Sequence, residues 1–167
     1  MNKTDENLRN AFAGESQANR RYLFYAEKAD EEGFSQIAKL FRAAAKAETI
    51  HAFNHIRVIG ETKSTIDNLK AAIKGENFEY KRMYPEYLSD SKKDKNQQAA
   101  WSFEVARKVE EVHASLFVKA AAALETGEQR VKTDYFVCSV CGNTVEKDVP
   151  EICSICNAPK EKFFKVA

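Results

Sequence analysis

Residues 41–55 of the chain read FRAAAKAETIHAFNH. Apolar residues recur here at the spacing of one helical face, from Phe41 through Ala44, and this pattern predicts an amphipathic helix. On that same face Glu48 and His51 stand where further apolar residues are expected. Residues three apart on a helix lie about 5–6 Å apart on one side, so the pair presents a carboxylate and an imidazole together. The segment therefore predicts a polar site inside a helical core.

The pair and its partner motif both occur twice. A second Glu-x-x-His pair lies at Glu110 and His113, and a Gly-Glu pair occurs at 14–15 and again at 75–76. The two motifs are separated by almost the same length of chain in each half, since the Gly-Glu pairs repeat at an offset of 61 and the Glu-x-x-His pairs at an offset of 62. This repeat predicts two helical hairpins of one plan, packed with pseudo-twofold symmetry into a four-helix bundle.

Helical periodicity covers nearly all of the chain before residue 126. It predicts four helices, at about residues 5–32, 35–59, 64 onward and 96–125. Gly33 and Gly60 are expected to end the first two helices. Pro85 is expected to kink or interrupt the third helix, because proline lacks the backbone N–H. Residues 126–133 have the composition of a polar linker, and the remainder shows no helical period.

Composition excludes several classes of protein. With 167 residues, the chain is long enough for one sizeable core and a small companion domain. Its six glycines and three prolines are too few for a turn-rich β-sandwich or barrel. A net charge of +1 provides no field that attracts nucleic acid or an acidic membrane surface, so neither is an expected partner. The polar N-terminal segment and the absence of a long apolar run predict no signal peptide, no membrane span and a cytoplasmic protein.

The repeated motifs place acidic groups at one level of all four predicted helices. Five glutamates and two histidines then share the core: Glu15, Glu48, His51, Glu76, Glu79, Glu110 and His113. Unpaired carboxylates in an apolar interior are very costly unless they are protonated, and two cations would neutralise the cluster. A Glu from each of two helices and a Glu-x-x-His from each of the others is the ligand set of a di-iron bundle. Mixed carboxylate and imidazole ligands suit iron or manganese.

Two alternatives remain at this stage. The glutamates could be ordinary surface residues beside a core histidine, although the matched repeat argues against this interpretation. His55, one helical turn beyond His51, suits a hydrogen-bonded core residue better than a ligand, but a role at the metal site is also open.

All four cysteines lie in the last thirty residues, as Cys138-Ser-Val-Cys141 and, after eleven residues, Cys153-Ser-Ile-Cys156. Two such pairs are the usual arrangement of a tetrahedral metal site. Gly142 and Asn157 follow the two pairs, and both residue types tolerate the positive φ that lets the backbone wrap round the sulfurs. Two disulfides are the alternative, which a reducing cytosol disfavours. Iron and zinc both accept four thiolates, so spacing alone leaves the metal open.

These motifs together resemble the rubrerythrin family over essentially the whole chain. That family joins a di-iron four-helix bundle to a rubredoxin-like domain that holds one iron on four cysteine thiolates. The resemblance implies an all-α ferritin-like four-helix bundle, with a di-iron domain over residues 1–130, plus a small C-terminal rubredoxin-like metal-binding domain over residues 134–167. It also implies that the cofactors are two bridged irons and one thiolate-bound iron, with zinc as a possible substitute.

Carried over residue by residue, the resemblance assigns roles in both domains. Glu79 is the extra glutamate that separates rubrerythrins from ferritins, and in the family it exchanges with the histidine matching His51 as one iron shifts with oxidation state. Tyr22 and Tyr84 match tyrosines that hydrogen-bond to ligand glutamates. The metal ligands are implied to be Glu15, Glu48, His51, Glu76, Glu79, Glu110 and His113 for the di-iron site, and Cys138, Cys141, Cys153 and Cys156 for the thiolate site.

The chain departs from the family at the cysteines. Rubredoxins usually carry Cys-Pro-x-Cys-Gly at both pairs, whereas Ser139 and Ser154 replace the prolines here and Asn157 replaces the second glycine. The loops are therefore stiffened less, and the reduction potential is open to change. Since the four ligands are intact, iron remains the expected metal.

The activity implied by the resemblance is reduction of hydrogen peroxide to water. Electrons would arrive one at a time through the thiolate-bound iron, from an NAD(P)H-driven reductase or from rubredoxin. A ferroxidase or other iron-handling protein of the ferritin superfamily is the first alternative, although storage needs no electron input. The second alternative is an adaptor whose cysteine-rich tail is stabilised by structural zinc and binds partners.

The connection between the second and third helices predicts how the chain assembles. A ferritin-like bundle needs these helices parallel, and the few residues from Gly60 to Lys63 are too short to cross from the end of one to the start of the other. The first two helices of one chain are thus expected to pack with the last two of another, as a domain-swapped homodimer. A start of the third helix near Lys70 would remove this constraint.

Overall fold

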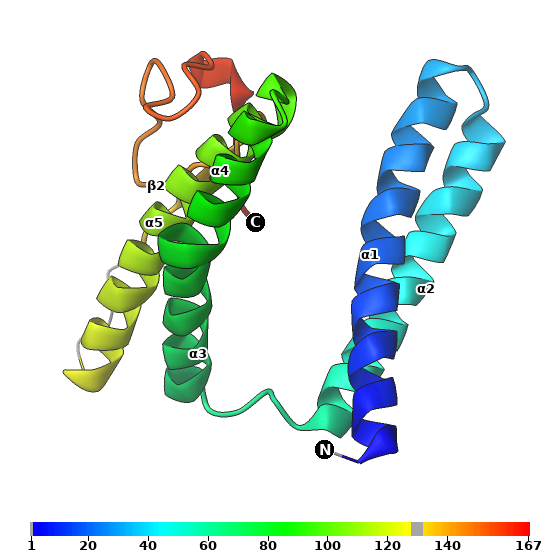
Figure 1. The fold of residues 1–167 in the computed structure, drawn as a ribbon, viewed down its shortest axis with the longest axis horizontal. Coiled ribbons are helices and arrows are strands. Elements are labelled where there is room, and N and C mark those ends of the chain that lie inside the picture. Colours follow the sequence, from blue (N-terminus) through cyan, green and yellow to red (C-terminus); the bar gives the residue numbers. More distant parts are fainter. Residues whose placement is uncertain (1, 128–131) are drawn as a thin grey trace. The chain divides into compact units, whose positions relative to one another are not determined.

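The structure is a computed structural model that describes residues 2–127 and 132–167. The chain divides into two compact units, one ending at Lys63 and the other spanning Ser64–Ala167 (Figure 1). The predicted domain boundary at residue 130 and the middle of the predicted linker lie outside the described residues.

The first unit is a hairpin of two long helices, α1 (Lys3–Glu31) and α2 (Ser35–Ile59). The side chain of Asn2 caps α1 by accepting a hydrogen bond from the backbone N–H of Asp5, and Gly60 ends α2 in the left-handed conformation. Small residues let the helices approach closely, since Ala26, Ala29 and Ala38 form the buried cluster between them. Both helix ranges agree with the prediction from periodicity.

Large apolar side chains remain exposed on this hairpin. Phe24, Leu40 and Val58 are each about 70% exposed, and Ile37 and Ile50 are about half exposed or more. A two-helix hairpin has no interior large enough to bury such side chains. The first unit therefore presents apolar surface that further helices can cover.

The second unit carries the remaining helices. They are α3 (Thr65–Phe78), the π-helix η1 (Glu79–Met83), α4 (Tyr84–Lys93) and α5 (Gln97–Glu125). Ser64 and Asn96 cap α3 and α5, because each side chain accepts a hydrogen bond from the backbone N–H three residues on. The segment α3–η1–α4 packs along α5 as the second hairpin (Figure 1).

The predicted interruption at Pro85 is confirmed, and the structure shows its form. Pro85 lies in the first turn of α4, directly after the π-helix. The backbone N–H of Tyr84 bonds to the carbonyl of Glu79, five residues back rather than four. Proline has no N–H to give and its ring crowds the carbonyl four residues earlier. The wider π-turn accommodates that conflict while the helix axis continues.

The C-terminal segment forms a small three-stranded antiparallel sheet in the order β2-β1-β3. The strands are β1 (Tyr135–Cys138), β2 (Thr144–Glu146) and β3 (Phe163–Lys165), with a short 3-10 turn η2 (Lys160–Lys162) before β3. Strand β2 lies against α5. Cys138, Cys153 and Ala158 make up the buried centre of this segment.

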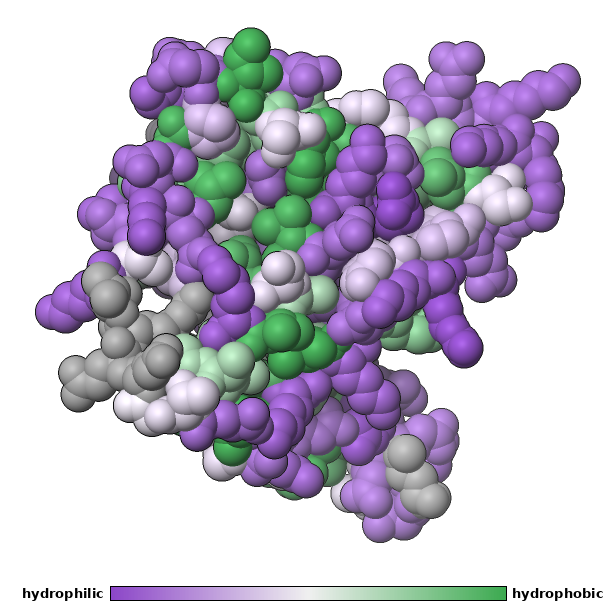
Figure 2. Space-filling model, turned by 90° about the vertical axis from the view of Figure 1, so that its left-hand side faces the viewer, coloured by the Kyte–Doolittle hydropathy of each residue, from purple (hydrophilic) through white to green (hydrophobic). Residues whose placement is uncertain are grey.

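Hydrophilic side chains cover much of the surface, with apolar patches between them, as Figure 2 shows for one face. Trp101, Val118 and Phe164 are among the large apolar side chains of the second unit that are at least half exposed. Within the part of the chain that the structure describes, none of the helices combines the length and apolar character needed to cross a membrane.

Candidate metal centres

Each helical hairpin gathers two glutamates and one histidine. On the first hairpin these are Glu15 of α1 with Glu48 and His51 of α2, whose ligand atoms all lie within 4.8 Å of one another. His51 Nδ1 is 2.8 Å from Glu48 Oε2. The histidine is about half exposed, whereas Glu48 is largely covered. The i, i+3 spacing in α2 produces this pairing.

The second hairpin repeats the arrangement with Glu76 of α3 and Glu110 and His113 of α5, again within 4.8 Å. His113 Nδ1 lies 2.7 Å from Glu110 Oε2 and 4.0 Å from Glu76 Oε2. The other ring nitrogen, Nε2, lies 3.0 Å from Thr144 Oγ1 of β2. Both carboxylates are mostly covered.

The two carboxylates of the second group repel one another, and the nearby imidazole offsets part of this repulsion. Burial, together with the hydrogen bond to Glu110, raises the pKa of Glu76 to about 7. The hydrogen bond to His113 holds the pKa of Glu110 below its ordinary value, and the same bond raises the pKa of His113. Oxygen Oε2 of Glu76 is buried without a hydrogen-bond partner. A bound cation would supply the missing partner for this oxygen and relieve the repulsion between the carboxylates, so the donor set fits a metal.

Glu79 stands at the first position of the π-helix. Burial raises the pKa of this carboxylate, and the nearby charge of Glu110 adds to the effect, so Glu79 lies in the electrostatic range of the second group. It is not among the three residues that converge there.

The π-helix also explains a detail of the internal repeat. Glu15 matches Glu76 at an offset of 61, but Tyr22 matches Tyr84 at an offset of 62. One residue has therefore been added between the two matches, and the π-helix over Glu79–Met83 lies in that interval. An extra residue in a helix is commonly absorbed as a π-turn. The second hairpin thus differs from the first by one inserted residue beside its glutamates.

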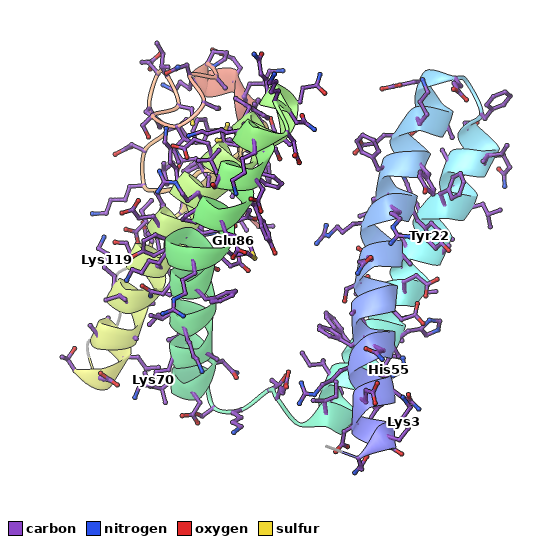
Figure 3. All side chains as sticks on the ribbon, in the orientation of Figure 1. Lys3, Tyr22, His55, Lys70, Glu86 and Lys119 are labelled. Carbon is purple, nitrogen blue, oxygen red and sulfur yellow. The ribbon has the colours of Figure 1, made fainter. Side chains whose placement is uncertain are left out.

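Both predicted tyrosines sit in matching aromatic clusters. On the first hairpin Tyr22, labelled in Figure 3, packs with Tyr25 and Phe41 at centroid distances of 6.3 and 6.2 Å. On the second, Tyr84 packs with its counterparts Tyr87 and Phe103 at 6.3 Å each. Burial raises the pKa of Tyr84, and the charge of Glu110 contributes, so this hydroxyl lies near the carboxylates.

His55, also labelled in Figure 3, lies on α2 one turn beyond His51. It is partly buried. Among the described residues it joins neither of the Glu, Glu, His groups.

The four cysteines converge on one point, with ligand atoms within 4.8 Å of one another. The sulfurs of Cys138 and Cys156 are 3.7 Å apart and those of Cys141 and Cys153 are 3.6 Å apart. These separations are too long for disulfides, and all four thiols are free. They approach the edge of about 3.8 Å expected of a tetrahedron with metal–sulfur bonds of about 2.3 Å. The predicted thiolate site therefore has the geometry that a metal requires.

The backbone around the sulfurs follows the sequence prediction. Gly142 and Asn157 both adopt positive φ, at 84° and 62°. Burial by itself raises the pKa of Cys153. The backbone N–H groups of Cys156 and Ile155 outweigh this effect and lower the pKa to about 7. A thiol that ionises near neutral pH is ready to ligate a metal.

Two polar residues near these centres were not predicted. Buried Asn143 directs its side-chain N–H at Cys153 Sγ, 3.6 Å away, and Thr144 contacts His113. Both lie within three residues after Cys141. No pattern in the sequence marks them, because their contacts join residues 10 and 31 positions apart.

Comparisons with known proteins match both parts of the chain. A family model described as rubrerythrin matches residues 6–121, and one described as its rubredoxin-like domain matches residues 136–164. Rubrerythrin-2 of Clostridium acetobutylicum is 36% identical over 174 residues, covering 96% of this chain and 95% of that protein. Nigerythrin of Nitratidesulfovibrio vulgaris is 31% identical over 177 residues, covering 98% and 86%.

Solved structures of nigerythrin in mixed-valence and all-ferrous states also match. Each is 30% identical, covers 99% of this chain and 88% of that chain, and has a TM-score of 0.59. The expected fold class, a ferritin-like helical domain with a small rubredoxin-like domain, is thereby confirmed. A family match over well more than half of the chain, and relatives that are 36% and 31% identical along almost its full length, show that the chain belongs to the rubrerythrin family.

Proposed function

We propose that this rubrerythrin reduces hydrogen peroxide to water, taking its electrons through the four-cysteine centre. The observation that carries the proposal is the contact between the two kinds of centre. Strand β2 follows the first cysteine pair and lies against α5, where Thr144 meets His113. A four-thiolate centre beside a carboxylate and histidine site is suited to delivering electrons, which iron storage does not need.

We propose that seven residues, contributed by the first hairpin and the second hairpin, hold two irons. They are Glu15, Glu48, His51, Glu76, Glu79, Glu110 and His113. Peroxide would receive two electrons, one from each iron, and with two protons become two molecules of water. The carboxylates neutralise the charge of the metals, and the imidazoles complete their coordination. Glu79, on the inserted π-turn, is the one ligand in this proposal without a counterpart in the first hairpin.

A cavity in the second unit gives small molecules access to this region. It has a volume of about 560 Å³ and reaches Glu76 and His113. Leu116 and Phe117 contribute apolar walls, while Tyr135 and Thr144 lie at the side of the rubredoxin-like sheet. Apolar walls exclude bulk water from a reacting centre and strengthen its electrostatic interactions. The volume accommodates peroxide easily.

The four cysteines are proposed to hold one iron that returns electrons singly. The electron donor to this iron would be an NAD(P)H-dependent reductase or rubredoxin. Zinc binds the same thiolates but has no redox chemistry, so zinc loading would block the route.

The proposed assembly is a domain-swapped homodimer. Helix α3 begins at Thr65, within one residue of the predicted start, so the connection is short. His51 lies about 12 Å before the end of α2 and Glu76 about 16 Å after the start of α3, so parallel helices leave a span of about 28 Å. The chain from Ile59 to Thr65 reaches at most about 21 Å. Helices α1 and α2 of one protomer would therefore share a bundle with α3 and α5 of its partner.

The test is an anaerobic single-turnover experiment on iron-loaded protein. The reduced protein receives less than one equivalent of hydrogen peroxide while the visible absorbance of the thiolate-bound iron is followed. We expect the colour to return quickly, in proportion to the peroxide added and faster than with oxygen. A thiolate centre that stays bleached while the di-iron absorbance grows would contradict the proposal and favour a ferroxidase.

A matched pair of variants localises the reaction. Glu110→Gln removes a proposed ligand and should slow the return of colour by more than about 100-fold, since even outer partners of metal ligands cost about 10- to 100-fold. Glu111→Gln changes the neighbouring exposed residue on α5 and should leave the rate unchanged. Equal rates in both variants would place the chemistry elsewhere.

A further inference from the structure

A side chain of the rubredoxin-like sheet contacts a residue of the proposed di-iron site. Thr144, the first residue of β2, brings its hydroxyl oxygen to 3.0 Å from Nε2 of His113. The other ring nitrogen of His113 faces the carboxylates, 2.7 Å from Glu110 Oε2. The two nitrogens of this imidazole thus face two different parts of the protein.

The hydroxyl of Thr144 has one hydrogen to donate. Its oxygen lies 3.2 Å from the carbonyl oxygen of Gly142, to which it donates. The lone pairs that remain on the hydroxyl oxygen then face His113 Nε2, and they can accept a hydrogen from it. A neutral imidazole with hydrogen on Nε2 has its free lone pair on Nδ1. This is the nitrogen that faces Glu110 and Glu76.

Two further contacts keep β2 in this position. Residues 144 and 146 point to the same face of the strand, and Glu146 forms an ion pair of 2.8 Å with Lys119 of α5. Lys119 is labelled in Figure 3. Gly142 lies so close to α5 that a Cβ atom there would be 3.8 Å from Val109. The strand is therefore fixed to α5 on both sides of the Thr144 hydroxyl.

We propose that Thr144 is a positioning residue for the di-iron site. Its hydroxyl holds His113 of the same chain in the tautomer that offers Nδ1 to a metal, and it ties that ligand to the loop that carries Cys141. Gly142 follows Cys141 directly, so the hydrogen bonds from His113 through Thr144 to Gly142 end beside a thiolate. The inference rests on the ligand assignment proposed above, but not on peroxide as the substrate.

Nuclear magnetic resonance of zinc-loaded protein tests the tautomer directly. The chain has three histidines, so the nitrogen signals of each ring can be assigned. We expect His113 to carry its hydrogen on Nε2, to exchange it slowly with water and to show a nuclear Overhauser effect to the Thr144 methyl group. Hydrogen on Nδ1, or fast exchange at Nε2, would overturn the proposal without any variant being made.

Metal affinity provides the second test. The thiolate site is first filled with one equivalent of zinc, and the carboxylate site is then titrated with cobalt(II). Thr144→Val keeps the shape of the side chain but removes the hydroxyl, and it should lower cobalt affinity by about 10- to 100-fold. Thr144→Ser restores the hydroxyl and should restore affinity.

Thr126→Val is the matched control, since its hydroxyl donates to the backbone carbonyls of Ala122 and Ala123 at the end of α5. It should bind cobalt like the unaltered chain. Equal loss in Thr144→Val and Thr144→Ser would show that restoring the hydroxyl does not restore cobalt affinity, and would overturn the proposal. If Thr144→Val does not fold, the titration of Thr144→Ser and the resonance test on the unaltered chain still decide.

Discussion

At the scale of single residues, Glu76 shows how a partly buried carboxyl group affects the stability of the metal-free protein. Its pKa is raised to about 7, first by burial and then by its neighbour Glu110. A raised pKa in an acid means that the folded state favours the protonated form. In the metal-free protein this favourable contribution is present below the ordinary pKa near 4.5 and is lost as pH rises through about 7.

The variant Glu76→Gln tests this balance, because an amide is neutral at every pH and can still donate to Glu110. In metal-free protein we expect it to raise the free energy of unfolding at pH 8 by about 1 kcal/mol, a value reduced for partial solvent screening, and to change it little at pH 5. Denaturant titrations at the two pH values measure the difference. Glu86→Gln, at an exposed position on α4 labelled in Figure 3, is the control and should have no such pH dependence.

An increase that is the same at both pH values would contradict the electrostatic explanation for Glu76. In iron-loaded protein the sign should reverse, since the variant lacks a proposed ligand and should lose metal. The same residue would then destabilise the empty protein and stabilise the loaded one.

The groups around Glu48 and Glu110 could be predicted from the sequence because helical spacing alone places a Glu and a His three residues apart on one face. The cysteine cluster could be predicted for the same reason, since short spacings determine most of its geometry. Thr144 could not, because its partner His113 lies on another element and only the docking of β2 on α5 brings them together. Local periodicity contains no information about such contacts.

At the scale of elements, the π-helix is the main difference between the two hairpins. Pro85 predicted an interruption, and the change of repeat offset from 61 to 62 located an added residue, but neither alone specifies a π-turn. The aromatic clusters on the two hairpins have nearly equal spacing, with Tyr22 and Phe41 at 6.2 Å and their counterparts Tyr84 and Phe103 at 6.3 Å. The insertion is therefore absorbed locally, and the packing beyond it is the same as in the first hairpin.

Deleting Lys81, which lies within the π-helix, should convert η1 into regular helix. We expect the variant to fold with a free energy of unfolding within about 1 kcal/mol of the unaltered chain, because α1 shows that the repeat packs without this residue. Backbone chemical shifts over residues 76–88 would report the conversion. Metal binding should weaken, since Glu79 would no longer lie on a widened turn.

Deletion of Arg20, which lies in the matching interval of α1 between Glu15 and Tyr22, is the control. No π-turn is present there to absorb the change, so the rest of α1 would rotate by about 100° relative to its apolar stripe. This deletion should cost about 3 kcal/mol or more, as large losses of core packing do. Equal destabilisation by the two deletions would show that the π-helix is not a removable insertion.

At the scale of the whole molecule, sequence periodicity predicted the ends of α1, α2 and α5 to within about two residues, because each of these helices is long and strongly periodic. The division of the described chain at Lys63 and Ser64 was not predicted, since the sequence suggested a boundary only near the cysteines. Each of the two units contains one complete hairpin and one Glu, Glu, His group. The exposed apolar residues of α1 and α2 are consistent with a hairpin that completes its core on a partner.

The short connection between α2 and α3 has a consequence that can be tested by genetic complementation. If the bundle is shared between protomers, a chain with Glu48→Ala and a chain with Glu110→Ala should repair one another when produced together. One of the two bundles in the mixed dimer would receive both defects and the other would receive none, so purified mixed dimers should bind half the di-iron of the unaltered protein. Pairing Glu48→Ala with Glu15→Ala, both on the first hairpin, should rescue nothing. Two defective genes would then produce one working site, because a substitution in one hairpin disables only the site that this hairpin forms with the partner chain.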